Sequence, residues 1–195
     1  MKIFLIEKSP SPTGNPFIFS MKPDTALLQR NRPFYIPEWT QEVQYETALV
    51  LKICKNGKYI QERFAHTYYD AITIGIDFTA RDVQNDLIAH GLPWEKSKVF
   101  DRSAPVGTFL PKEQLNLPQG IHFSLKKNGE TVQSGNSLDM LYNFDRIIVE
   151  LSQYVTIRMG DLIFTGTPAG AGTVQMGDLL EAFIGDKMLL RVPVR

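Results

Sequence analysis

The chain has 195 residues, with 21 basic and 21 acidic side chains, which fits one domain large enough to bury a core without disulfides. The formal net charge of zero argues against a nucleic-acid partner, which would need a basic face. The single cysteine and three histidines exclude a disulfide framework and metal sites rich in cysteine or histidine, so any metal must be bound by carboxylates.

The N-terminal stretch MKIFLIEKSPSP contains an apolar run that is too short for a signal peptide. No window of the chain is long and apolar enough to predict a membrane-spanning helix. We therefore expect a cytoplasmic protein without a membrane partner.

The first half of the chain is predicted to be rich in strands. Asn56-Gly57 is typical of a hairpin turn, and Thr79 is a candidate N-cap for a helix that ends before Gly91 and Pro93. The expected strands are residues 2–6, 17–21, 43–53, 58–66 and 71–78.

The second half contains an extended segment at 98–111 and a second predicted hairpin around Asn128-Gly129, within 120–133. Ser137 is a candidate cap for a longer helix, whose apolar residues recur at helical spacing at Leu141, Phe144, Ile148 and Leu151. Further strands are expected at 161–165, 179–183 and 188–193. Together the elements predict one α+β domain dominated by a mixed sheet.

Three segments could carry chemistry. Asp77 ends an apolar strand just before the expected helix, although the residue pattern alone slightly favours a turn residue there and a solvated Arg81. Glu46 interrupts an apolar strand, which indicates either an exposed face or, if it faces Asp77, a pair of carboxylates suited to Mg²⁺ or Mn²⁺. The glycine-rich TGTPAGAG at 165–172 is either a tight turn or a place for a substrate carboxylate. A nucleotide site is disfavoured, because no lysine or helix follows it as phosphate-binding motifs require.

Three ordered motifs resemble the fumarylacetoacetate hydrolase family over about residues 35–195. They are IDFTARDVQNDLIAHGLPWEKSKVFDRSAPVGTFLP, NGETVQSGNSLDMLY and GDLIFTGTPAGAG. The resemblance implies a β-roll built on a large mixed sheet with a few flanking helices. It divides the chain into a diverged segment 1–34, in place of the family's lid region, and a catalytic part 35–195 within one structural domain.

The resemblance also implies an activity on small oxo or enol acids: C–C hydrolysis, decarboxylation or isomerisation. In this family a divalent ion, Mg²⁺, Mn²⁺ or Ca²⁺, stabilises enolate charge, and the protein is usually a homodimer. The implied metal ligands are Glu46 and Asp77; the implied catalytic residues are Lys98 and Thr167; and the implied substrate-binding residues are Arg81, Gln84 and Thr167.

Two departures from the family pattern affect this expectation. The family's E-x-E pair falls on Glu46 and Ala48, so the second carboxylate is replaced by a methyl group and metal binding is expected to weaken. The family's water-activating H-x-x-E pair is absent from the N-terminal segment, because the first histidine is His66, and any lid is expected to be short. The sequence therefore leaves two hypotheses: an enzyme with an incomplete site, or a catalytically impaired relative that binds an oxo acid or acts as a structural subunit.

Overall fold

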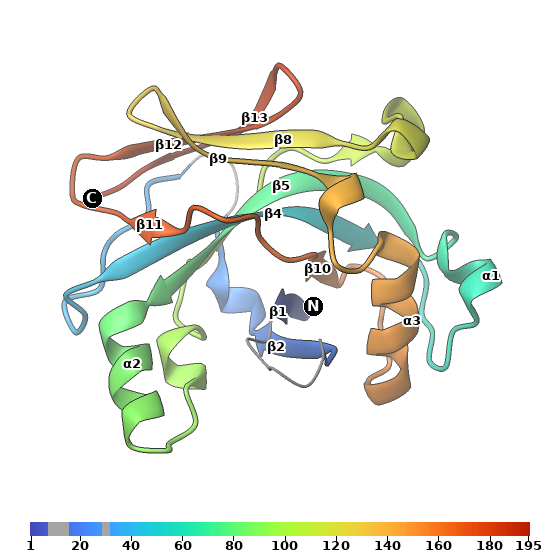
Figure 1. Cartoon of the computed structure of the whole chain (residues 1–195). Helices are drawn as coiled ribbons and strands as arrows, with labels where there is room; N and C mark the ends of the chain where they lie inside the picture. Colours follow the sequence, from blue (N-terminus) through green and yellow to red (C-terminus); the bar gives the residue numbers. More distant parts are fainter. Residues whose placement is uncertain (8–15, 29–31) are drawn as a thin grey trace.

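The computed structural model describes residues 1–7, 16–28 and 32–195, and shows two β-sheets packed face to face with helices on the outer side of the larger one (Figure 1). The α-helices are α1 (Glu62–Ala65), α2 (Arg81–Ala89) and α3 (Phe144–Tyr154). The strands are β1 (Ile3–Glu7), β2 (Ile18–Lys22), β3 (Leu27–Leu28), β4 (Val43–Ile53), β5 (Tyr69–Ala80), β6 (Ala104–Pro105), β7 (Leu110–Pro111), β8 (His122–Lys127), β9 (Glu130–Asn136), β10 (Leu162–Phe164), β11 (Gly172–Thr173), β12 (Leu179–Ile184) and β13 (Lys187–Pro193). Short 3₁₀ turns are η1 (Asp24–Ala26), η2 (Glu95–Ser97), η3 (Lys112–Gln114), η4 (Leu117–Gln119) and η5 (Ser137–Asp139).

The larger sheet has the strand order β2-β1-β10-β4-β5-β7, and β11 also pairs with β4. Its long central strands β4 and β5 are antiparallel, and their register sets Glu46 directly opposite Asp77. Strand β1 runs parallel to β10, whereas the other pairs in this sheet are antiparallel. The sheet is therefore mixed, as expected.

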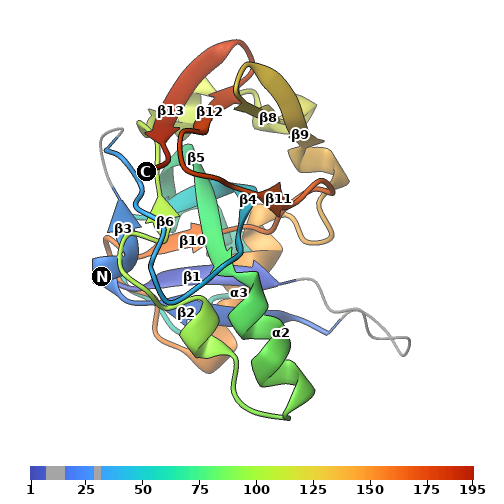
Figure 2. The same cartoon turned by 90° about the vertical axis from the view of Figure 1, so that its left-hand side faces the viewer.

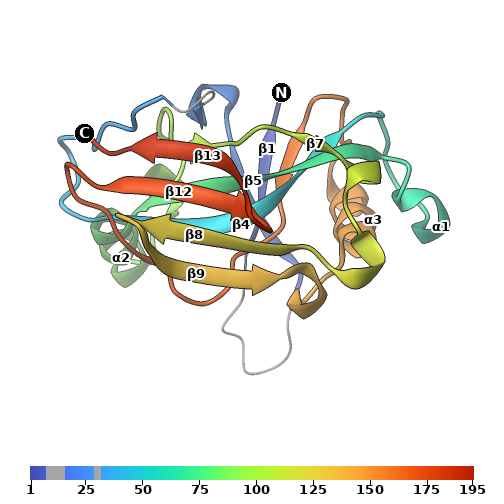
Figure 3. The same ribbon diagram turned by 90° about the horizontal axis from the view of Figure 1, so that it is seen from above.

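The smaller sheet has the order β13-β12-β8-β9 and covers one face of β4 and β5 (Figures 2 and 3). On the opposite side, β1 and β2 lie between α2 and α3 (Figure 1). A parallel pair, β3-β6, forms a separate two-stranded sheet.

The core follows the alternation of side chains along β4. Leu49 and Leu51 belong to the large apolar cluster that includes residues of the smaller sheet, whereas Ala48 and Val50 belong to a second cluster with β1 and β10. Because both faces of β4 are covered, the strand reads as a nearly continuous apolar run. Glu46 shares the parity of Ala48 and Val50, so it belongs to the face of the second cluster.

Gly75 shows how tightly this second cluster is packed. It lies opposite Ala48 in the register of β4 and β5. A Cβ atom at Gly75 would lie 2.6 Å from the Phe164 ring and 2.8 Å from a methyl group of Val50. Glycine therefore lets Phe164 pack directly on the backbone of β5.

Most predicted strands are confirmed. The 43–53 strand has the predicted bounds, and the other confirmed strands differ from prediction by a few residues at their ends. The second hairpin is confirmed as β8–β9. Its turn places Asn128 and Gly129 at φ 54° and 89°, the left-handed conformations that favour Asn-Gly in two-residue hairpins. Of the extended segment 98–111, only β6 and β7 are strands.

The first predicted hairpin is wrong. No strand lies directly after Asn56-Gly57, and the antiparallel partner of β4 is β5, which starts at Tyr69. Gly57 instead forms an isolated bridge with Ile157, and the side-chain oxygen of Asn56 accepts a 2.8 Å hydrogen bond from the Met159 amide. Part of the expected strand 58–66 forms the short helix α1. A distant loop thus takes the hydrogen bonds that a hairpin partner would have taken.

Both predicted helix caps are also wrong. Thr79 remains inside β5, and α2 begins after Ala80 without a side-chain cap. Ser137 opens only η5, because its hydroxyl accepts a hydrogen bond from the Ile121 amide; the helix starts later, capped by Asn143. Leu141 consequently lies outside the helix and is half exposed.

The division at residue 34 remains a prediction. Strands β1 and β2 belong to the same sheet as β4 and β5. The stretch 8–15, part of the segment 1–34 expected in place of the family's lid region, lies outside the described residues, as do residues 29–31. Among the helices of the described ranges, none is long and apolar enough to cross a membrane.

Candidate active site

A cavity of about 440 Å³ opens where β1 and β5 end and α2 begins, beside the first half of β4. Its lining includes every site residue that the sequence singled out: Glu46, Asp77, Arg81, Gln84, Lys98 and Thr167. The chain thus brings these six residues together from two strands, one helix and two loops.

Lys98 joins the two carboxylates of neighbouring strands. Its ammonium nitrogen lies 2.5 Å from Asp77 Oδ2 and 3.6 Å from Glu46 Oε2. The direct pairing of Glu46 with Asp77 across β4 and β5 makes this convergence possible. Lys98 itself follows η2 and is only 3% exposed.

A second buried lysine, Lys22 at the end of β2, holds the other oxygen of Asp77. Lys22 Nζ lies 2.6 Å from Asp77 Oδ1 and donates to the Phe78 carbonyl, the Ser103 carbonyl and the Ser103 hydroxyl at 2.8–3.1 Å. Sequence reasoning missed Lys22, because a lysine that ends a short strand is usually exposed. Here it anchors Asp77 from behind the cavity.

Burial and charge shift these pKa values in opposite directions. Burial opposes ionisation of Asp77, but Lys22 and Lys98 outweigh it and hold its pKa below the ordinary value. Burial lowers the pKa of Lys22 to about 8, against the pull of Asp77. For Lys98 the burial effect is outweighed by Asp77, Glu7 and Glu46, so its pKa is raised.

Glu7, the last residue of β1, is a third carboxylate of the site. One of its oxygens lies 3.5 Å from Lys98 Nζ and accepts a 2.8 Å hydrogen bond from the Ser20 hydroxyl. Burial raises the pKa of Glu7, more than Lys98 lowers it. Glu7 was not predicted as a site residue, although it ends an apolar strand, the same sequence pattern that pointed to Asp77.

Arg81, the first residue of α2, is a further cation in the lining of the cavity. Arg81 Nε donates a 2.8 Å hydrogen bond to the side-chain oxygen of Gln44, and Nη1 donates one to the side-chain oxygen of Gln84. Arg81 Nη2 lies 3.9 Å from Glu46 Oε1. Gln44 was not predicted, although it lies on the same face of β4 as Glu46, two residues away. These contacts fix the direction of the guanidinium group.

Thr167 is positioned by the second motif of the sequence. The buried Gln133 side chain donates to the Thr167 hydroxyl and to the Pro168 carbonyl, both at 3.2 Å, and accepts from the Thr47 amide at 2.9 Å. Gln133 therefore ties the TGTP turn to β4. Its role was not predicted beyond its membership of the motif.

The donor set partly fits a divalent cation. Carboxylate oxygens are the ligands that Mg²⁺ and Mn²⁺ prefer, and Glu46 and Asp77 present them in one cavity. Ala48 adds no donor, and the described part of the chain contains no group of three His, Cys, Asp or Glu arranged to hold an ion. The site fits an ion held by two carboxylates and completed by water or substrate oxygens, in competition with Lys98.

The sequence matches the family model described as fumarylacetoacetate (FAA) hydrolase C-terminal over residues 4–195. The mitochondrial oxaloacetate tautomerase FAHD1 of Mus musculus is 36% identical over 182 residues, 93% of this chain and 82% of the relative. The oxaloacetate tautomerase YcgM of Escherichia coli strain K12 is 35% identical over 91% of this chain and 81% of its own.

Solved structures agree with this similarity. The fumarylpyruvate hydrolase of Pseudomonas aeruginosa, in complex with Mn²⁺ and pyruvate, has a TM-score of 0.90 and 29% identity, covering 100% of this chain and 90% of its own. The relatives thus act on small oxo acids, and the predicted α+β fold with mixed sheets is confirmed. The family match over nearly the whole length shows that this chain belongs to the fumarylacetoacetate hydrolase family.

Proposed function

We propose that the chain acts on a small oxo or enol acid by stabilising enolate charge with divalent-metal assistance. The observation that carries this proposal is the convergence of Glu46, Asp77 and Lys98 in one cavity with the cation Arg81. A carboxylate–oxo head group offers adjacent oxygens that such a combination of cations and carboxylate-bound metal can hold. The names of the relatives, oxaloacetate tautomerase and fumarylpyruvate hydrolase, support this substrate class.

Each residue has a proposed role. Arg81 and Gln84 bind the substrate carboxylate, and their mutual hydrogen bond orients both side chains. Lys98 places a positive charge beside the enolate oxygen, and Thr167 donates or accepts a hydrogen bond at the substrate. Glu46 and Asp77 would hold Mg²⁺, or Mn²⁺ or Ca²⁺, with weakened affinity because Ala48 supplies no second carboxylate beside Glu46 on β4. When bound, the ion supplies Lewis-acid stabilisation of the enolate.

Among the reactions of this family, tautomerisation or decarboxylation is favoured over C–C hydrolysis. Hydrolysis needs an activated water, and the sequence contains no histidine before His66 with which to build the family's H-x-x-E pair. Moving charge onto an enolate oxygen requires only the cations of the site.

One observation favours a second candidate, a catalytically impaired relative that binds an oxo acid or acts as a structural subunit. Both carboxylate oxygens of Asp77 are already paired with the ammonium groups of Lys22 and Lys98. A metal ion would have to share Asp77 with these two ammonium groups or displace one of them. If it cannot, the site retains binding without metal-assisted chemistry.

The test measures the melting temperature with Mn²⁺ or Mg²⁺, with oxalate, and with both. At ligand concentrations near 100 times the dissociation constant we expect about 2.7 kcal/mol of stabilisation, because the ligands bind only the folded chain. No change at millimolar metal plus oxalate would refute the metalloenzyme proposal. A change with oxalate alone would support the binding-only candidate.

Activity is then followed as conversion of enol to keto oxaloacetate in Lys98→Met. We expect a loss of kcat of at least about 100-fold, while the matched Lys96→Met, at an exposed lysine two residues away, retains activity. Equal activity of wild type and Lys98→Met would show that Lys98 has no role in the reaction.

Homodimerisation and a cytoplasmic location belong to the same proposal. Light scattering on the purified chain would test the first. The second needs localisation in the source cell, since the relative from Mus musculus is named as mitochondrial.

A further inference from the structure

A tautomerisation moves a proton at C3, the carbon next to the oxo carbon, and needs a group to carry that proton. Glu46 and Asp77 are the proposed holders of a metal ion, and Arg81 and Lys98 are cations that neither accept nor carry the C3 proton in the proposed roles. A further group with a basic oxygen is therefore needed near C3.

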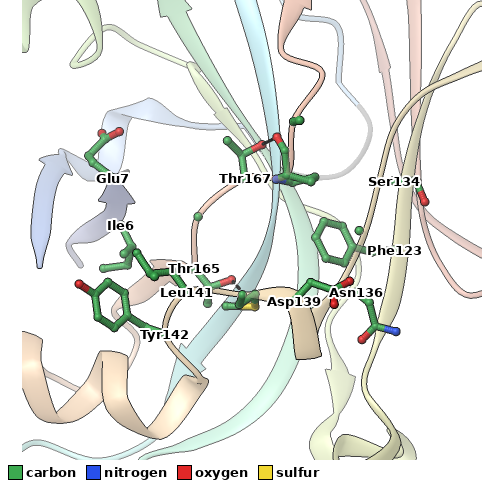
Figure 4. A pocket seen from close by; sticks show the side chains of 15 residues that line it. Ile6, Glu7, Phe123, Ser134, Asn136, Asp139, Leu141, Tyr142, Thr165 and Thr167 are labelled. Carbon is green, nitrogen blue, oxygen red and sulfur yellow. Dashed lines mark hydrogen bonds between the residues drawn. The ribbon is translucent and has the colours of Figure 1, made fainter. Parts of the chain in front are cut away.

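Glu7 lies where the candidate active site meets a second cavity, of about 290 Å³ (Figure 4). The linings of the two cavities share Ile6, Glu7, Gly166 and Thr167. Among these shared residues of the described chain, Glu7 is the one that carries a carboxyl group. Figure 4 shows Glu7 and Ile6, from the end of β1, on one side of the second cavity.

The distance between Glu7 and Lys98 suits a proton transfer at C3. Lys98 is proposed to lie beside the enolate oxygen, and a Glu7 oxygen lies 3.5 Å from Lys98 Nζ. Ordinary C=O and C–C bond lengths put C3 about 2.4 Å from the same substrate oxygen. A carboxylate this close to Lys98 is therefore within reach of a proton on C3. The rest of the substrate then has the second cavity to occupy.

The Glu7 carboxyl group is held in place and partly screened from water. Its Oε1 atom accepts a 2.8 Å hydrogen bond from the Ser20 hydroxyl, and the side chain is 22% exposed. Burial raises the pKa of Glu7 above its ordinary value, which strengthens the carboxylate as a proton acceptor. Asp139, another carboxyl group in the lining of the second cavity, is exposed and does not line the candidate active site.

We infer that Glu7 is a catalytic residue that takes the C3 proton from a 2-oxo acid and, in the reverse direction, returns a proton to C3. This inference rests on the proposed function, because it requires the oxo oxygen to lie beside Lys98. The electron pair of the C3–H bond becomes the C2=C3 double bond, and the π pair of the carbonyl moves onto the oxygen. A proton from solvent completes the enol, and Glu7 releases its own proton to solvent.

Exchange of the pyruvate methyl protons for deuterium reports this step directly, because the methyl carbon is C3. The related fumarylpyruvate hydrolase structure is a complex with pyruvate, which makes it a suitable probe. Proton NMR in D₂O, with the full chain and Mg²⁺, is expected to show catalysed exchange. Glu7→Gln keeps the shape of the side chain and is expected to lower the exchange rate by at least about 100-fold while still binding oxalate.

The matched control is Glu130→Gln, the same change at the exposed first residue of β9. Residue 130 lines neither cavity, so wild-type exchange is expected.

Chemical rescue distinguishes proton transfer from mere compensation of the charge of Lys98. In Glu7→Ala, formate supplies a carboxylate in the space of the missing side chain and is expected to raise the exchange rate at least about tenfold. Chloride supplies the same charge without a basic oxygen and is expected to leave the rate of Glu7→Ala low.

The outcomes separate the two proposals. Failure of the wild type to bind oxalate would refute the proposed head site and the inference with it. Oxalate binding with equal exchange in wild type and Glu7→Gln would overturn the inference and leave the proposed function standing. Equal rescue of Glu7→Ala by formate and chloride would also overturn it, because Glu7 would then act only through its charge. Oxalate binding without exchange by the wild type would overturn the inference and favour the binding-only candidate.

Discussion

At the residue scale, the site is a balanced set of buried and partly buried charges. Glu7, Glu46 and Asp77 are compensated by Lys22, Lys98 and Arg81. A buried ion pair gains little over apolar packing, but removing one partner leaves an uncompensated charge. Each member therefore influences the ionisation of the others.

Lys22→Met is expected to destabilise the chain by about 3–5 kcal/mol, because Asp77 loses its rear anchor while staying buried. Urea unfolding measures the change. Lys187→Met, at an exposed strand position, should stay within about 0.5 kcal/mol of wild type. Adding Asp77→Asn to Lys22→Met should recover part of the loss; a loss below about 1 kcal/mol in Lys22→Met would contradict the anchoring role.

Restoring a carboxylate should strengthen metal binding. Ala48 and Gln44 flank Glu46 on the same face of β4, two residues to either side. Ala48→Glu tests the position implied by the family resemblance, and Gln44→Glu is the matched variant on the other side. We expect higher Mn²⁺ affinity in Ala48→Glu; a gain only in Gln44→Glu would show that the E-x-E pair was assigned in the wrong direction.

Acid stability should depend on Asp77. Its folded-state pKa lies below the ordinary 3.8, so between the two values the unfolded chain binds more protons than the folded one. The contribution of Asp77 is complete above about pH 4 and is lost as the pH falls through its folded-state pKa. Urea unfolding from pH 2 to 5 should show a steeper loss in wild type than in Asp77→Asn; parallel curves would contradict this coupling.

At the scale of elements, strands were predicted well and helix starts poorly. The alternation and apolar run of β4, and the Asn-Gly turn of β8–β9, are local signals that the tertiary structure keeps. The two cap predictions were wrong for different reasons. Thr79 stays in β5 because it pairs with Gln44 of β4, and the Ser137 hydroxyl is taken by the amide of Ile121, 16 residues earlier. The candidate site residues of β4 and β5, Glu46 and Asp77, are indicated by the family resemblance rather than by local pattern alone, whereas Lys22 and Glu7 depend on how β1 and β2 join the sheet.

The cap of α3 offers a test at this scale. Asn143→Ala should cost about 1 kcal/mol, because the Asn143 side chain accepts a 2.8 Å hydrogen bond from the Arg146 amide. Asn85→Ala, at an exposed position inside α2, should be neutral or slightly stabilising because alanine favours helix. Thermal unfolding of the two variants would distinguish them, and equal stability would show that the cap does not support α3.

At the scale of the whole molecule, β1 and β2 are part of the main sheet. Ile3 and Phe4 are fully buried, and β1 lies between β2 and β10. A chain lacking residues 2–28 should therefore lose cooperative thermal unfolding, which calorimetry measures. Retention of a sharp transition and of oxalate binding would instead show that the chain folds and binds without β1 and β2.

The parallel pairing of β1 with β10 has a consequence for the order of folding. It joins Ile3 to Leu162, so the strand that carries Glu7 can pair early with β2 but finds its second partner only after more than four-fifths of the chain has been synthesised. Closing so long a loop is slow compared with forming the local β8–β9 hairpin. On the ribosome, β4 and β5 can pair early, but the carboxylate cluster around Lys98 becomes complete only when β10 arrives, so binding competence marks the end of folding.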